Sequence, residues 1–166
     1  FESVADAAQR RGCHVVDLVR WFGGAPRSVV ARIVNTSGVY EIDDNAAAVV
    51  EFESKALGMV DASWVQRGGP SPFELYGTRG TVSIGGPGDV KLWTDRLSIP
   101  GMERTQGAFV PRALPAAAPM PMAQWVRAIE DGTPATITVH DGRNLTEMLE
   151  AMYRSSSEGR AINLPL

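Results

Sequence analysis

The chain has 166 residues, of which 44% are apolar and 21% charged, and its 16 basic and 19 acidic side chains give a net charge of −3. This is the length of one ordinary domain with its own core, and the composition excludes collagen-like, coiled-coil and disordered proteins. The sequence shows neither the basic patch typical of nucleic-acid binders nor an apolar stretch long enough for a membrane span. Cys13 is the only cysteine, so no internal disulfide forms, and a cytoplasmic location is expected.

A helix is predicted from about residue 4 to residue 22. Its apolar side chains recur at helical spacing and form a stripe of Val15, Leu18, Val19 and Phe22. Gly23 and Gly24 follow directly and end the helix.

The next seventy residues are predicted to be strands. Runs rich in Val, Ile and aromatic residues occupy residues 28–35, 46–53, 59–66, 73–78, 81–84 and 90–93. Short turns at residues 54–58 and 79–80 join neighbouring runs. Parallel strands need crossovers of a dozen or more residues, so these short turns indicate an antiparallel sheet.

The last part of the chain is predicted to be an irregular segment followed by two helices. Five prolines interrupt residues 96–121, helical periodicity returns from residue 122, and residues 135–139 suit a brief strand. A last helix is predicted from an Asp141 N-cap to Gly159, before a final edge strand at residues 161–164. Together these elements predict an α+β class, in which an open, mainly antiparallel sheet carries helices on one face. The expectation is one domain spanning residues 1–166.

His14 is the first candidate for chemistry. Asp17 follows three residues later on the same predicted helix, where a carboxylate can hold one tautomer of a general acid or base. The alternative is a surface histidine without a catalytic task. Cys13 points about 100° round the helix from its neighbour, which suits a buried small side chain better than a Cys-His pair.

No metal site is predicted, because His14 and His140 lie far apart in sequence and no clustered carboxylates join either. Trp64 and Arg67, near the end of a predicted strand, are candidate pocket residues, since aromatic and guanidinium groups suit polyol recognition. Core packing for Trp64 and a solvated Arg67 remain the alternatives. The glycines at residues 85–88 follow a strand but precede no helix, so they are interpreted as a loop.

Three segments together resemble a known family. The segment GCHVVDL at residues 12–18 resembles the G-x-H-x-x-D-L helix of the glucose–fructose oxidoreductase, inositol dehydrogenase and rhizopine-catabolism (Gfo/Idh/MocA) oxidoreductases. The segment FELYGTRGTVSI at residues 73–84 is similar to that family's strand pair around YGTxG. Residues 141–160 are similar to its closing helix and last strand.

The resemblance is to the C-terminal half of these enzymes. It implies an open antiparallel sheet whose free face packs against a second copy, in a homo-dimer or a higher oligomer. It also implies a separate Rossmann domain that binds NAD or NADP in the parent protein. The chain shows no such nucleotide motif and begins with Phe1, so it is expected to be a piece of a longer protein that binds no cofactor by itself.

The resemblance assigns His14 the family's proton-transfer position. The family's aspartate four residues earlier is replaced here by Arg10, which cannot serve as a base. Arg10 is therefore a candidate for binding an acidic sugar, or marks a different proton path or lost activity. Asp17 matches a second family aspartate with a structural role.

Two functions follow as hypotheses. The first is the substrate-binding and oligomerisation domain of an NAD(P)-dependent oxidoreductase that acts on a sugar, inositol or related polyol. In it His14 is catalytic, and Arg10, Trp64 and Arg67 contact the substrate. The alternative is a non-catalytic module for association or for binding a small ligand. Neither hypothesis involves a nucleic acid or a membrane.

Overall fold

The computed structural model describes residues 5–39, 41–66, 73–85 and 89–166, with residues 5–11 described by their backbone alone. The chain divides into two units, one formed by residues 1–66 and 124–166 and the other by residues 67–123. Helices and antiparallel sheets together make the fold α+β, as the sequence predicts.

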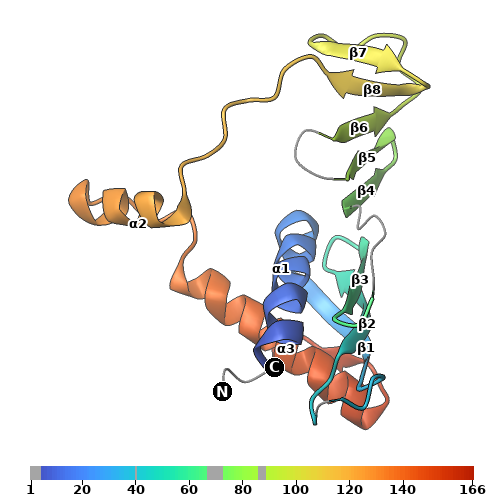
Figure 1. The fold of residues 1–166 in the computed structure, drawn as a ribbon, viewed down its shortest axis with the longest axis vertical. Coiled ribbons are helices and arrows are strands. Elements are labelled where there is room, and N and C mark those ends of the chain that lie inside the picture. The colour runs from blue at the N-terminus through green and yellow to red at the C-terminus, as the bar shows by residue number, and fades with distance from the viewer. Residues whose placement is uncertain (1–4, 40, 67–72, 86–88) are drawn as a thin grey trace. The chain divides into compact units, whose positions relative to one another are not determined.

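The first unit is a four-stranded sheet with two helices (Figure 1). Its strands lie in the order β3-β2-β1-β9, and every pair is antiparallel. The elements are α1 (Ala5–Gly23), β1 (Pro26–Val34), β2 (Asn45–Phe52), β3 (Leu57–Ser63), α3 (Val139–Glu158) and β9 (Ile162–Asn163). A further helix, α2 (Pro121–Glu130), precedes α3 in the chain.

One face of this sheet is buried under α1 and α3, as side-chain alternation along the strands predicts. The buried strand residues are Val29, Ala31, Ala48, Val50, Phe52, Val60 and Ile162, and the buried helix residues are Val16, Val19, Met148, Ala151, Met152 and Ser155. The side chains between them, on the opposite face of the strands, stay exposed.

Glycines let α1 approach the sheet closely. A Cβ at Gly23 would lie 2.2 Å from Cζ of Phe52, and a Cβ at Gly58 would lie 2.6 Å from Cγ1 of Val19. The buried face of α1 therefore runs through Val16 and Val19. The predicted stripe is wrong at Phe22, which is 51% exposed, because the helix turns its glycine side to the sheet.

A capping box starts α3. The Thr138 hydroxyl accepts a hydrogen bond from the Asp141 backbone N–H, while the Asp141 carboxylate accepts one from the Thr138 N–H at 2.9 Å. Asp141 is thus the third helical residue rather than the predicted N-cap. The strand predicted at residues 135–139 is wrong, because the helix already begins at Val139. Gly159 ends α3 with φ 66°, as predicted.

Serine hydroxyls on α3 replace backbone pairing along β1. The edge strand β9 pairs only with Ser28 and Val29. Farther along β1, the N–H groups of Ala31 and Ile33 donate to the hydroxyls of Ser155 and Ser156, at 2.9 and 2.8 Å. The helix therefore satisfies strand donors that the short β9 leaves unpaired.

The second unit is a five-stranded antiparallel sheet in the order β4-β5-β6-β8-β7. Its strands are β4 (Phe73–Gly77), β5 (Gly80–Ile84), β6 (Val90–Trp93), β7 (Met102–Thr105) and β8 (Ala108–Pro111). The prediction of an irregular segment at 96–121 is wrong for β7 and β8. Gln106 and Gly107 have φ of 50° and 87°, so they form a two-residue hairpin turn inside the proline-rich stretch.

Candidate functional site

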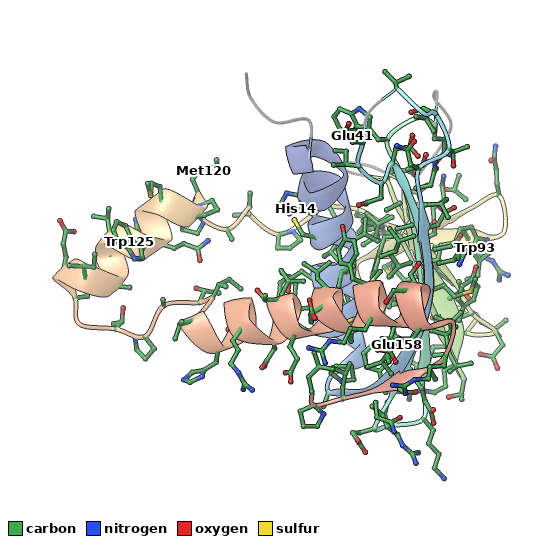
Figure 2. The ribbon with its side chains drawn as sticks, turned by 90° about the horizontal axis from the view of Figure 1, so that it is seen from below. His14, Glu41, Trp93, Met120, Trp125 and Glu158 are labelled. Carbon is green, nitrogen blue, oxygen red and sulfur yellow. The ribbon has the colours of Figure 1, made fainter. Side chains whose placement is uncertain are left out.

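His14 lies on the third turn of α1 and its side chain is exposed to solvent. Figure 2 shows the imidazole on the side of α1 turned away from the strands. Val16 and Val19 are buried against the sheet and so fix the rotation of α1 about its own axis. This rotation places the His14 ring on the exposed side of the helix. A histidine placed this way can reach a molecule bound outside the first unit.

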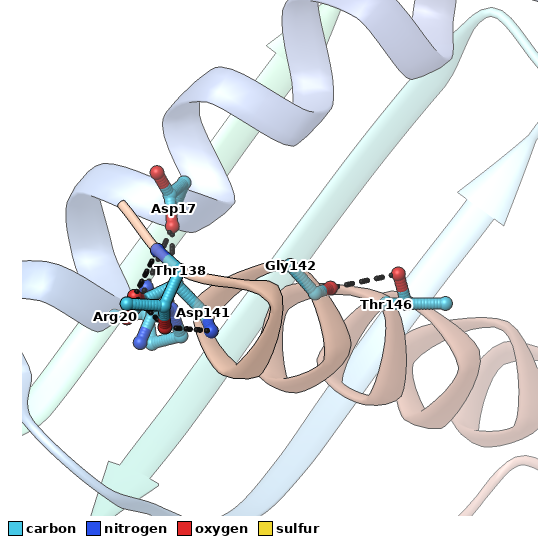
Figure 3. Close-up of polar contacts among 6 residues, drawn as sticks. All are labelled: Asp17, Arg20, Thr138, Asp141, Gly142 and Thr146. Atoms are coloured by element: carbon cyan, nitrogen blue, oxygen red, sulfur yellow. Dashed lines mark hydrogen bonds and ion pairs between the residues drawn. The ribbon is translucent and has the colours of Figure 1, made fainter. Parts of the chain in front are cut away.

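Asp17 is engaged by Arg20 on the same helix (Figure 3). The guanidinium donates to Oδ1 of Asp17 from Nε at 3.2 Å and from Nη2 at 3.0 Å. The Arg20 side chain is 14% exposed, so solvent screens this pair only in part. The Asp17 carboxylate therefore faces Arg20, and among the described residues it makes no hydrogen bond or ion pair with the His14 ring.

Arg20 also connects α1 to α3. Its Nη2 lies 3.3 Å from Oδ1 of Asp141, the capping residue of α3. Hydrogen bonds from the backbone and side chain of Thr138, followed by the Arg20 charge, lower the pKa of Asp141 from its ordinary value. One guanidinium thus pairs with both carboxylates and holds the end of α1 against the start of α3.

Trp64 and Cys13 line a small cavity of about 70 Å³ between α1, α3 and the ends of β1, β2 and β3. Its walls are mainly apolar, and at one side the Tyr153 hydroxyl donates to Oδ1 of Asp43 at 3.1 Å. Cys13 is half-buried and faces this cavity, as expected for a small side chain on the inner side of the helix. The described lining does not include His14, so the structure does not bring His14 and Trp64 into one cavity.

Asp44 fixes the backbone beside Trp64. Its carbonyl accepts the Trp64 N–H at 2.8 Å, and its carboxylate accepts the N–H groups of Thr36 and Ser37 at 2.7 and 2.9 Å. A hydrogen bond from the Ser37 side chain, together with the Thr36 backbone, lowers the Asp44 pKa from 3.8 to about 2. The ionised carboxylate therefore holds the loop between β1 and β2 in place.

Asp44→Ala is expected to lower the Tm at pH 7 by about 5 °C or more, because two loop N–H groups lose their acceptor. The folded-state pKa is depressed, so the stabilisation is complete above 3.8 and is lost as the pH falls through about 2. The Tm difference between the two proteins should shrink over that interval in calorimetric scans. Asp61→Ala, an exposed change on β3, is the control, and an equal loss there would contradict the assignment.

The other predicted site residues are only partly placed. Arg10 lies on α1, but its side chain is outside the described atoms, and Arg67 lies outside the described residues. His140 is exposed at the start of α3. Within the described ranges no group of three or more His, Cys, Asp or Glu side chains is arranged to hold a metal ion.

Sequence reasoning missed two polar pairs. The Asp17–Arg20 spacing is readable as an (i, i+3) pair, but the Asp141 partner lies 121 residues away in sequence. The Tyr153–Asp43 pair spans 110 residues and also leaves no local signal.

The first unit is an antiparallel sheet with α1 and α3 on one face, and α1 carries an exposed histidine; solved oxidoreductases share this fold. Residues 8–83 match the family model of the GFO/IDH/MocA C-terminal domain. The resemblance drawn from the motifs is confirmed, since these residues and the relatives below are similar to the C-terminal domain of this family.

Individual proteins of known activity or structure are also similar to this chain. D-apiose dehydrogenases of Paraburkholderia graminis and Rhizobium rhizogenes are 25% and 22% identical over 92% of this chain, and the match covers 43% and 47% of their own length. The chain thus spans about half the length of these curated relatives. GenD2 from gentamicin A biosynthesis, solved in complex with NAD, is 29% identical with a TM-score of 0.68, over 96% of this chain and 48% of GenD2.

A second solved structure shows the likeness of fold alone. Levoglucosan dehydrogenase, in complex with NADH and L-sorbose, is 18% identical with a TM-score of 0.73, over 98% of this chain and 49% of that protein. Separately, none of the helices in the described part of the chain is both long enough and apolar enough to cross a membrane.

Proposed function

We propose that this chain is the substrate-binding and oligomerisation domain of an NAD(P)-dependent oxidoreductase that acts on a sugar, inositol or related polyol. The observation that carries the proposal is the exposed His14 at the family's motif position on α1. The relatives named as D-apiose dehydrogenases and the NAD complex of GenD2 support the substrate and cofactor classes.

His14 has one task in this reaction. The nicotinamide cofactor, held outside this chain, would supply the hydride acceptor, and His14 would accept the proton of the hydroxyl on the carbon that is oxidised, so that a carbonyl forms. The exposed imidazole is free of the Asp17–Arg20–Asp141 ion pairs, which hold the helix without occupying the ring. General base catalysis of this kind needs the acceptor nitrogen within hydrogen-bond reach of the hydroxyl.

The described residues do not fit a nucleotide site. In the dinucleotide fold a strand runs through a glycine-rich turn directly into a helix, whose N-terminus holds the pyrophosphate. Among the described elements no strand leads through such a turn into a helix. The cofactor is therefore assigned to another part of the parent protein, and no step of the mechanism passes through a cofactor site on this chain.

Calorimetry tests whether the cofactor binds to another part of the parent protein rather than to this chain. The 166-residue chain is expected to show no saturable heat with NADH or NADPH at micromolar concentration, whereas the parent protein is expected to bind one of them and oxidise polyols. The measurement is isothermal titration, followed by a screen of sugars and cyclitols with both cofactors. Micromolar binding by the chain alone would contradict the assignment.

The free face of the first sheet is the proposed oligomer surface. Strand register places Val30 beside Val49 and Val49 beside Met59, so an apolar row crosses three strands. These side chains are 52%, 43% and 79% exposed, and Leu57 on the next row is 71% exposed. A continuous exposed apolar row on a sheet is typical of a protein–protein contact.

Val49→Glu is expected to convert a dimer into a monomer, because the new carboxylate sits at the centre of this apolar row. Light scattering after size exclusion measures the mass of both proteins at the same concentration. Arg32→Glu, which adds negative charge on the neighbouring polar row, is the control and should leave the dimer largely intact. A wild-type monomer would contradict the proposed contact.

Arg10 favours a second candidate function, a non-catalytic module for association or ligand binding. It stands where the family resemblance places an aspartate beside the proton-transfer histidine. Polyol oxidation by the parent protein would exclude this candidate, since a non-catalytic module predicts none.

A further inference from the structure

A second and larger cavity lies at the far end of α1. Its volume is about 560 Å³, within the range of pockets that hold small molecules. It is formed inside the first unit by the last turns of α1, the turn at residues 24–26, the first turns of α3 and the chain end at residues 164–165. It lies two helical turns, or about 10 Å, along α1 from His14. We call it the Trp21 cavity.

Trp21 gives this cavity a flat apolar wall. The indole is 67% exposed, although it belongs to a helix whose other side is buried against the sheet. Its ring centroid lies 5.8 Å from that of Phe22, which supports the indole from one side. An exposed indole beside a concave surface presents an apolar face to which the C–H face of a sugar ring can stack.

Hydrogen-bonding groups line the same cavity as the indole. Thr136 and Asn144 line the cavity, and neither side chain hydrogen-bonds to another described residue. Arg20 lies at the base with its guanidinium shared between two carboxylates. A hydroxyl, an amide and a guanidinium around an aromatic wall are a donor and acceptor set that suits polyhydroxylated ligands.

The charge of the cavity selects against anions. Asp17, Asp141 and Glu147 line it together with the single cation Arg20. Arg143 approaches Glu147 to 4.0 Å but is not among the lining residues. A phosphate or carboxylate group would therefore meet like charge without a free cationic partner, whereas a hydroxyl or an ammonium group would not.

We propose that the Trp21 cavity binds a neutral or amine-bearing sugar or cyclitol ring, stacked on Trp21 with its hydroxyl groups toward Thr136 and Asn144. This site goes beyond the proposed function, because it needs neither His14 nor a nicotinamide cofactor.

Nuclear magnetic resonance of the indole N–H groups tests the site on the 166-residue chain. The four tryptophans give four signals, and comparison with Trp21→Ala assigns the one that matters. Titration with glucose and with glucosamine is expected to shift the Trp21 signal saturably at millimolar concentration. Glucose 6-phosphate is expected to bind at least tenfold more weakly, because its phosphate faces the carboxylates.

Matched variants distinguish sugar binding in the Trp21 cavity from non-specific binding to exposed indoles. Asn144→Ala is expected to weaken glucosamine binding severalfold and Trp21→Ala at least tenfold, as followed in both variants by the amide shift of Ile137 at the cavity. Trp125→Ala removes another exposed indole, on α2, and should leave binding unchanged.

Two results would overturn the proposal. One is the absence of a saturable Trp21 shift up to about 50 mM of both sugars, a concentration well above typical millimolar binding. The other is burial of the Trp21 indole in the parent protein, seen as protection from acrylamide quenching, which would make the cavity a packing surface for another segment.

Discussion

Replacing His14 with alanine is expected to lower kcat of the parent protein about a hundredfold for polyol oxidation, which is the usual size of a general acid–base contribution. Without the imidazole, the hydroxyl proton must leave to water while the hydride departs. The measurement is NAD(P)H formation at saturating substrate, across pH 6 to 10.

His140→Ala is the matched control, because it removes another exposed histidine, at the start of α3. Its kcat should stay within about twofold of the wild-type value, since surface changes away from a site have small effects. Unchanged turnover in His14→Ala would remove this histidine from the mechanism. A loss confined to KM would assign it to substrate binding instead.

The elements nearest in sequence could be predicted from the sequence. The hairpin of β2 and β3 follows from two alternating runs joined by a short turn at residues 54–58, and its register confirms the pairing. The start and end of α1 follow from its apolar periodicity and the glycines after Phe22. These signals are local, because the turn and the strands that it joins lie within twenty residues.

Contacts between distant segments could not be predicted. Nothing near Ser155 or Ser156 indicates that their hydroxyls bind the backbone of β1, more than 120 residues earlier. The strands β7 and β8 were not predicted, because Pro100 and Pro111 at their borders are typical of irregular segments. Tertiary pairing overrides such weak local preferences.

In the candidate site, too, the local feature could be predicted from the sequence and the contacts between distant segments could not. The resemblance pointed to His14, and the structure places that side chain on the exposed side of α1. The partner of Arg20 on α3 and the cavity beside Trp21 depend on packing between α1 and α3, which only the folded chain displays. The polar anchoring of α1 is therefore a property of the fold rather than of the motif.

Phe52→Ala is expected to destabilise the first unit by about 3–5 kcal/mol, the usual cost of emptying a buried aromatic site. The ring is 2% exposed and fills the space that Gly23 of α1 and Gly58 of β3 leave open. Neither glycine has a side chain that can move into the vacated volume, so the cavity persists. Urea unfolding measures the loss as a lower midpoint with an unchanged m-value.

Phe22→Ala makes the same chemical change at a 51% exposed position one residue before Gly23. It should cost no more than about 1.5 kcal/mol, since only half of the ring leaves water and its neighbour Trp21 is itself exposed. Equal losses in the two variants would mean that Phe52 does not hold α1 on the sheet. A larger loss at Phe52 would show that this buried ring helps to hold the helix carrying His14 on the sheet.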